Sequence, residues 1–282
     1  MSQALGETKP SEPTEAEQVV ERVSVGLLES IGRRINAILE YAGGITLLGW
    51  ETIKTIFRLR IRFAETVTQC YLLGYQSLII VLLTSLFTGM VFSLESAVQA
   101  VQYGFGSFVG GIVSYTNVRE LGPMLTSVVV AGRVCAAIAA ELGSMQVTEQ
   151  IEALKSLGLA PVRFLVVPRL LALMIMLPLL TIFADVVGVM GGEWIAHQQA
   201  HIGYEDFMSS ARQTVGFLDV VKGLLKALVF GIVIAMVGAY QGLTTTGGAA
   251  GVGRSATSAV VTCIILIFIL NFVMSYFLYA GA

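Results

Sequence analysis

Five long apolar segments, separated by short polar stretches, dominate the hydrophobic pattern of the chain. A transmembrane helix needs about 20 apolar residues, so each segment is long enough to cross a bilayer. The first segment carries no charged residue and exceeds the length of a straight crossing, which indicates a tilted, bent or partly re-entrant helix. The pattern predicts an all-α integral membrane protein with a transmembrane domain over 64–282 and spans at about 66–94, 108–141, 164–196, 219–243 and 256–280.

Two features of these segments refine the prediction. Small residues four positions apart allow two helices to approach closely, and such pairs occur at Ser85 with Gly89 and at Gly188 with Gly192. The stretch between the third and fourth spans, 197–218, is polar and is predicted to be a loop.

The residues before the first span are amphipathic or polar. Residues 1–18 form an acidic, proline-containing tail that is predicted to be disordered. Over 19–63 apolar residues recur at helical spacing, interrupted at Gly43-Gly44, which predicts amphipathic helices lying in the plane of the headgroups. The alternative is an ordinary helix packed on a soluble partner.

A short amphipathic segment, at about 144–158, separates the second and third spans. Its apolar residues recur at helical spacing, at Val147, Ile151, Leu154 and Leu157. Gly158 suits the position after a helix, and Pro161 prevents continuation. This segment is predicted to be a helix that lies across the membrane exit and docks a partner through Met145, Thr148, Glu149, Gln150, Glu152, Ala153 and Leu154.

The distribution of lysine and arginine predicts the orientation. The basic residues on one side are Lys54, Arg58, Arg60, Arg62, Lys155, Arg163, Arg169 and Arg254. The loops on the opposite side contribute only Arg212, and Lys222 and Lys226 lie just inside the fourth span. The N-terminus and the 143–163 connection are therefore predicted to be cytoplasmic, and the C-terminus periplasmic or extracytoplasmic.

Composition supports a membrane protein and excludes other classes. The chain is 55% hydrophobic and only 13% charged, with a mean hydropathy of +0.80, whereas a soluble domain has roughly 25% charged residues. The net charge of −2 and the lack of a basic stripe argue against nucleic-acid binding. Cys70, Cys135 and Cys263 are isolated in apolar stretches, so we expect them to pack rather than to pair or to bind metal. The N-terminus resembles neither a signal peptide nor a transit peptide.

Two motifs resemble catalytic signatures without the residues that the chemistry needs. The segment 248–255 approaches a nucleotide P-loop, but Arg254 replaces the lysine and membrane helices replace the strand that precedes a P-loop. We expect a flexible cytoplasmic turn there and no ATP hydrolysis by this chain. His197 and His201 copy the spacing of a zinc protease motif, but Gln198 replaces the general base, so we expect a polar loop and no metal site.

Ionisable residues within the spans are the strongest functional signal in the membrane domain. Such a side chain costs at least about 2.5–3.5 kcal/mol, so it pairs or faces water. Arg119 and Arg133 lie about four helical turns apart and are predicted to share one face, with Glu95 among the carboxylates available to pair with them. A structural ion pair and a role in a transport path explain these charges equally well. The predicted network consists of Arg119, Glu120, Arg133, Glu141 and Asp185.

The stretch ELGSMQVTEQIEAL at 141–154, with RELGP at 119–123, resembles the signature of the MlaE-type permeases. These are the membrane subunits of the Mla/Mce lipid ABC transporters, and the similarity covers most of the chain. The resemblance implies a non-catalytic homodimer that works with an ABC ATPase, which binds ATP and Mg, and with an MCE-domain protein; a STAS-domain protein binds the ATPase in some members. It implies a phospholipid cargo, an inner (plasma) membrane location, no cofactor in this chain and an ATPase contact at the 144–158 helix.

The resemblance also implies that the first span lines a lipid cavity at the dimer interface. The candidate lipid-binding residues are Tyr75, Leu78, Leu82, Val91 and Glu95. Glutamine is common in the family where this chain has Glu95. A second hypothesis is a stand-alone secondary transporter or channel that uses the intramembrane charges as an ion or proton relay, although it does not explain the amphipathic helix at 144–158.

Overall fold

The computed structural model describes residues 15–57 and 62–279, and every regular element in them is a helix. The chain divides into two compact units, residues 1–47 and 48–282. The predicted disordered tail lies outside the described residues up to position 14, and residues 15–18 already belong to α1 (Glu15–Phe57).

Helix α1 runs without interruption through Gly43-Gly44, so the predicted break there is wrong. A glycine inside a helix costs only about 1 kcal/mol relative to alanine. The long run of helix-forming residues on both sides of the pair outweighs that cost. The location of α1 at the membrane surface stays a prediction.

Among the residues that the structure describes, five helical segments of the second unit are long and apolar enough to cross a membrane, which confirms the predicted count. The first is Phe63–Gln102, composed of α2 (Phe63–Gln69), η1 (Cys70–Gly74), η2 (Tyr75–Ser77) and α3 (Leu78–Gln102). The second is Gly106–Val147, composed of η3 (Gly106–Phe108), α4 (Val109–Thr116), η4 (Asn117–Leu121), α5 (Gly122–Val130), η5 (Ala131–Cys135) and α6 (Ala136–Val147). The others are Val162–Ala200, composed of η6 (Val162–Val166) and α8 (Val167–Ala200), then α10 (Phe217–Leu243) and α11 (Gly248–Tyr279).

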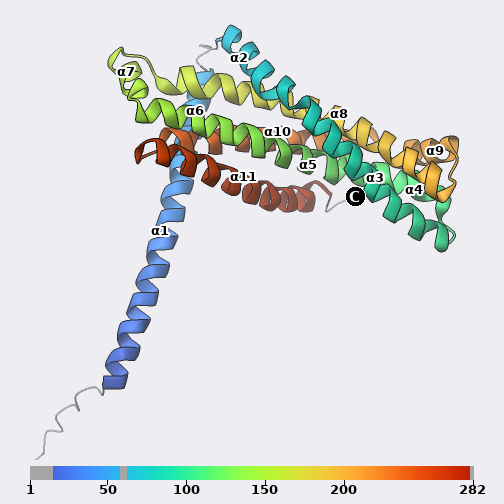
Figure 1. Ribbon diagram of the computed structural model, residues 1–282, viewed down its shortest axis with the longest axis horizontal. Coiled ribbons are helices and arrows are strands. Elements are labelled where there is room, and N and C mark those ends of the chain that lie inside the picture. Colours follow the sequence, from blue (N-terminus) through green and yellow to red (C-terminus); the bar gives the residue numbers. More distant parts are fainter. Residues whose placement is uncertain (1–14, 58–61, 280–282) are drawn as a thin grey trace, which may run out of the picture. The chain divides into compact units, whose positions relative to one another are not determined.

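Two short helices mark opposite ends of this helical bundle (Figure 1). Helix α7 (Gln150–Ser156) connects the second and third spans, and α9 (Tyr204–Thr214) connects the third and fourth. A Cβ atom on Gly143 would lie 2.9 Å from the Oγ1 atom of Thr245, so the turn between α10 and α11 lies at the α7 end. The two ends are called the α7 end and the α9 end below.

Small residues join α3 to α8 along their length, as the small-residue pairs predict. The hydroxyl groups of Ser85 and Ser93 donate hydrogen bonds to carbonyl groups of α8, the second to Gly192 at 2.6 Å. A Cβ atom on Gly89 would overlap the backbone of Gly188. Close backbone contact and these hydrogen bonds replace the hydrophobic effect, which does not drive helices together in lipid.

The polar stretch 197–218 is mostly helical, so the loop prediction is wrong there. Helix α8 extends to Ala200, and α9 packs on α4, where the Gly111 N–H donates to Ser210 Oγ at 3.0 Å. His201 ends α8 in a left-handed conformation with φ 53°. Because the helix ends between the two histidines, His197 and His201 do not share a helical face.

The glycine-rich segment 248–255 is not a turn but the first turns of α11. The turn lies just before it, at 244–247, and positive φ angles at Gly247 and at the first residue of α11, Gly248, lead from the turn into the helix. In a P-loop the glycines form a loop between a strand and a helix, whereas here they already belong to a helix.

We expect Gly89→Ala to lower the melting temperature of the purified protein, because the added methyl group forces α3 and α8 apart and overpacking costs about 1–3 kcal/mol. Gly253→Ala is the matched control, since no atom lies within 4 Å of its Cβ position in α11. Thermal unfolding followed by size-exclusion chromatography in detergent measures both. Equal melting temperatures would contradict the close packing described here.

Candidate functional site

The α7 end presents a sharp bend followed by an exposed helix. Helix α6 ends at Val147, and Thr148 Oγ1 donates to the Ser144 carbonyl at 2.8 Å. Glu149 then takes a left-handed conformation with φ 59°, which turns the chain into α7. Residues other than glycine seldom adopt this left-handed conformation, so the direction of α7 is set by the backbone of Glu149.

One residue anchors α7, and the others are accessible. Ile151 is only 2% exposed and holds the helix against the bundle. Of the predicted docking residues, Met145 and Leu154 are half-buried, and the exposed ones are Thr148, Glu149, Gln150, Glu152 and Ala153. Leu157, which the apolar periodicity placed on the same face as Ile151, is 73% exposed because α7 ends at Ser156. With Leu159, also exposed, it adds an apolar surface that the sequence did not predict.

Helix α3 has one buried face and one exposed face. The buried residues follow a spacing of four and are Val81, Ser85, Gly89, Ser93 and Ala97. The opposite face, called here the α3 stripe, is exposed at Ile79, Leu83, Phe87, Val91 and Glu95. It therefore offers a continuous apolar surface that ends in a carboxylate towards the α9 end.

The predicted lipid-binding residues lie on the α3 stripe or next to it. Val91 (61% exposed) and Glu95 lie on the α3 stripe, and Tyr75 (60% exposed) lies one turn before it. Leu78 and Leu82 are half-buried at its side. Beyond the stripe, a groove of about 680 Å³ is lined by Ser96, Gln99, Ala100, Tyr103, Phe105, Phe108 and Ile112.

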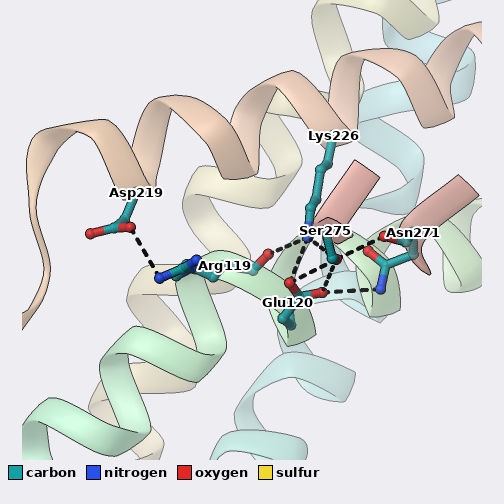
Figure 2. Close-up of polar contacts among 6 residues, drawn as sticks. All are labelled: Arg119, Glu120, Asp219, Lys226, Asn271 and Ser275. Atoms are coloured by element: carbon teal, nitrogen blue, oxygen red, sulfur yellow. Dashed lines mark hydrogen bonds and ion pairs between the residues drawn. The ribbon is translucent and has the colours of Figure 1, made fainter. Parts of the chain in front are cut away.

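A cluster of polar side chains around the buried Lys226 joins the second, fourth and fifth spans (Figure 2). Lys226 of α10 has a fully buried side chain, and its Nζ donates to Glu120 Oε1 at 2.7 Å and to the Arg119 carbonyl at 3.0 Å. Asn271 and Ser275 of α11 also donate to the Glu120 carboxylate, at 3.0 Å and 2.9 Å. One carboxylate thus satisfies donors from two other helices.

The neighbouring Arg119 points towards α10 and α11. Its guanidinium group lies 3.7 Å from Asp219 (Figure 2). It also lies over the ring of Tyr279, with 3.3 Å between Cζ and the ring centroid. Tyr115 lies on it as well, at 4.4 Å. Contacts with aromatic faces and a carboxylate are favourable for a guanidinium group removed from water.

Among the described residues, neither Arg119 nor Arg133 forms an ion pair with one of the candidate carboxylates, although each member of the predicted network has a polar contact in the structure. Arg119 pairs with Asp219, Glu120 with Lys226, and Glu141 with Arg169 at 2.7 Å. Asp185 accepts a hydrogen bond from Asn117 at 3.3 Å. Arg133 instead contacts the first span.

Two π-turns, η4 and η5, lie in the second span and explain why Arg119 and Arg133 do not share a face. A π-turn contains one more residue than a turn of α-helix and rotates the following residues by about 100°. The sequence pattern places Lys226 only among the basic residues that indicate the orientation, and it does not single out Ser275. A lysine inside an apolar span normally has a buried partner, so Lys226 carried a usable signal.

Comparisons with known proteins agree with this architecture. The family model described as Permease MlaE matches residues 66–277. A probable ABC transporter permease protein of Synechocystis is 45% identical over 222 residues, which make up 79% of this chain and 84% of that protein.

The chain belongs to the MlaE permease family. A probable ABC transporter permease protein of Rickettsia conorii is 36% identical over 88% of this MlaE permease and 96% of its own length. The Arabidopsis thaliana protein TRIGALACTOSYLDIACYLGLYCEROL 1, chloroplastic, is 38% identical over 84% of this chain and 68% of its own length. This MlaE permease is thus a multi-pass membrane subunit of an ABC transporter, which implies an ATPase partner.

We expect Lys226→Met to destabilise the MlaE permease by about 3 kcal/mol, because it leaves the Glu120 carboxylate without its cation. Adding Glu120→Gln in the same chain removes the charge that was left unpaired and recovers part of the loss. Thermal unfolding of the wild type, both single variants and the double variant completes a double-mutant cycle. Additive single effects would show that the pair is not coupled.

Proposed function

We propose that this permease moves phospholipid between membranes, using ATP hydrolysed by a separate ATPase subunit. The observation that carries the proposal is the α3 stripe, an exposed apolar surface about as long as a lipid chain that ends at Glu95. A lipid needs an apolar path for its acyl chains, and polar side chains beside that path for its headgroup. The name of the Arabidopsis relative refers to a diacylglycerol glycolipid, which supports a lipid cargo.

The α7 end is the proposed contact with the ATPase. The bend at Glu149 projects α7 from the end of α6. The exposed residues of α7 offer charged contacts, and Leu157 and Leu159 offer apolar ones. The chain itself is non-catalytic in this proposal, and ATP and Mg bind the partner. The helical start of α11 supports this division, since it does not form a phosphate loop.

The remaining parts of the complex follow from the same proposal. A second copy of the chain completes the cavity along the α3 stripe, and an MCE-domain protein receives lipid at the α9 end, beside the groove of about 680 Å³. A STAS-domain protein binds the ATPase in complexes that contain one. The α7 end and the N-terminus are cytoplasmic and the C-terminus is periplasmic, in an inner (plasma) membrane.

A stand-alone secondary transporter is the weaker alternative. Arg119, Glu120 and Glu141 all form ion pairs with residues of other elements, so these charges serve packing. A relay needs groups that exchange protons or ions along a path, and paired, buried groups do so poorly. Membership of a family of ABC permeases also favours a driven permease.

We expect Val91→Arg to remove most of the phospholipid that co-purifies with the transporter, because a cation on the α3 stripe is incompatible with acyl chains. Ile175→Arg on α8 is the matched control, since the two positions are 59% (Ile175) and 61% (Val91) exposed. Native mass spectrometry of the intact transporter measures the bound lipid. If both variants keep the wild-type amount, the stripe is not the lipid path.

We expect Glu149→Lys to lower lipid-stimulated ATP hydrolysis at least about ten-fold, because a contact worth about 1.4 kcal/mol is lost at the ATPase interface. Glu205→Lys on α9 makes the same charge reversal at an exposed site of the opposite end. ATPase assays and co-purification of the two subunits measure the effect. Undiminished coupling in Glu149→Lys would remove α7 from the ATPase contact.

A further inference from the structure

Arg133 lies in the π-turn η5 of the second span and reaches across to the first span. Its Nη1 donates to Ser77 Oγ at 2.7 Å and to the Leu72 carbonyl at 3.4 Å, and its Nη2 donates to Gln76 Oε1 at 2.8 Å. All three acceptors are uncharged. They belong to the irregular joint Cys70–Ser77, where a π-turn is followed by a 3₁₀ turn.

The positive charge of Arg133 has no carboxylate within 4.0 Å among residues 15–57 and 62–279. Arg119, Arg169 and Lys226 differ in this respect, since each has an acidic partner. A guanidinium group has five N–H donors. Three acceptors from the first span therefore leave donors, and the whole charge, for another ligand.

The hydrogen bonds that hold the joint Cys70–Ser77 to the second span do not require a charged donor. A neutral donor satisfies a hydroxyl, an amide and a carbonyl oxygen equally well, and a charged group inside a bilayer costs at least about 2.5–3.5 kcal/mol. The charge therefore costs free energy and adds nothing to the stability of the joint unless an anion binds to it. Three hydrogen bonds fix the plane of the guanidinium group in advance, which suits an anion-binding role.

The guanidinium group is reachable from an exposed surface. Gln76 is exposed, its neighbour Tyr75 is 60% exposed, and Ile79 at the start of the α3 stripe is 72% exposed. On the side of the second span, no atom lies within 4 Å of a Cβ placed on Gly132. The stacked rings of Tyr71 and Tyr75, with centroids 5.3 Å apart, flank the same joint. A ligand on the α3 stripe can therefore place an anionic group at Arg133.

We propose that Arg133, held by Gln76 and Ser77, binds the phosphate group of a phospholipid whose acyl chains lie on the α3 stripe. The inference rests on the proposed function and adds a phosphate subsite at the joint Cys70–Ser77, in the first half of the first span. A planar guanidinium group binds phosphate through two parallel N–H bonds. Lipids that carry a phosphate, whether anionic or zwitterionic overall, are retained over those that lack one.

The experiment measures lipid bound to the intact transporter, ATPase included, by native mass spectrometry. Three probes with the same acyl chains are offered: phosphatidylglycerol, phosphatidylcholine and diacylglycerol. We expect Arg133→Gln to lower retention of both phospholipids about ten-fold, the loss of one charge-assisted contact, and to leave diacylglycerol unchanged. Arg133→Lys, which keeps the charge without the planar fork, retains an intermediate amount and covers the case in which Arg133→Gln does not fold.

Arg212→Gln on α9 is the matched control, because it removes an exposed arginine at the other end of the bundle and is expected to change none of the three. Inorganic phosphate at an equimolar amount displaces no phospholipid from the wild type if a lipid headgroup is the ligand. Displacement at an equimolar amount would show that the site prefers a free anion to a lipid phosphate and would overturn the proposal.

The other outcomes distinguish a failure of the phosphate subsite from a failure of the proposed function. Unchanged phospholipid retention in Arg133→Gln overturns the phosphate subsite, whereas lipid loss in Val91→Arg still supports the proposed function. If Arg133→Gln loses all three probes equally and has a lower melting temperature, Arg133 only stabilises the joint Cys70–Ser77, and the phosphate subsite is overturned. Dissociation of the complex in Arg133→Gln assigns its counter-charge to a neighbouring subunit. Failure of the wild type to bind any probe contradicts the proposed function itself.

Discussion

A bilayer gives a polar group no water to bind, and this constraint organises the membrane domain. A charge within the spans needs a partner, because an unpaired buried charge is costly. Lys226 and Glu120 meet that need together with Asn271 and Ser275, and the contacts join three spans at one point (Figure 2). Glu141 and Arg169 join the second and third spans in the same way. The charges act as fixed joints between helices whose surfaces are otherwise apolar.

The contact between α3 and α8 solves a different problem. Apolar side chains gain little by leaving lipid for protein, so these helices associate through small residues and backbone approach. Ser85, Gly89 and Ser93 let α3 use a narrow strip for packing. The rest of its circumference stays available as the α3 stripe. The same small residues that fasten the helix thus leave a lipid-sized surface on its other side.

Polar joints and exposed surfaces occupy separate parts of the second unit. The α7 end combines a left-handed residue with an exposed helix anchored by Ile151, and the α9 end holds the groove beside α3 and α4 (Figure 1). Arg133 lies between the two ends, at the irregular joint of the first span. A protein that receives motion at one end and handles lipid along its length requires such a separation. The family supports this organisation, since its relatives are ABC transporter permeases.

The sequence by itself determined the five spans, the short helix between the second and third, and the set of charges that had to find partners. Hydropathy and helical periodicity are local properties, and they survive folding wherever a segment is long and strongly patterned. Local patterns failed where neighbours decided the outcome, as at Gly43-Gly44, in α9 and in the first turns of α11. Only the tertiary structure decided which charges pair. The two π-turns changed the phase of the second span, and the partners Asp219, Lys226 and Ser275 come from helices about a hundred or more residues away. Ion pairing depends on distances of a few ångströms between side chains, which sequence spacing along one helix does not fix.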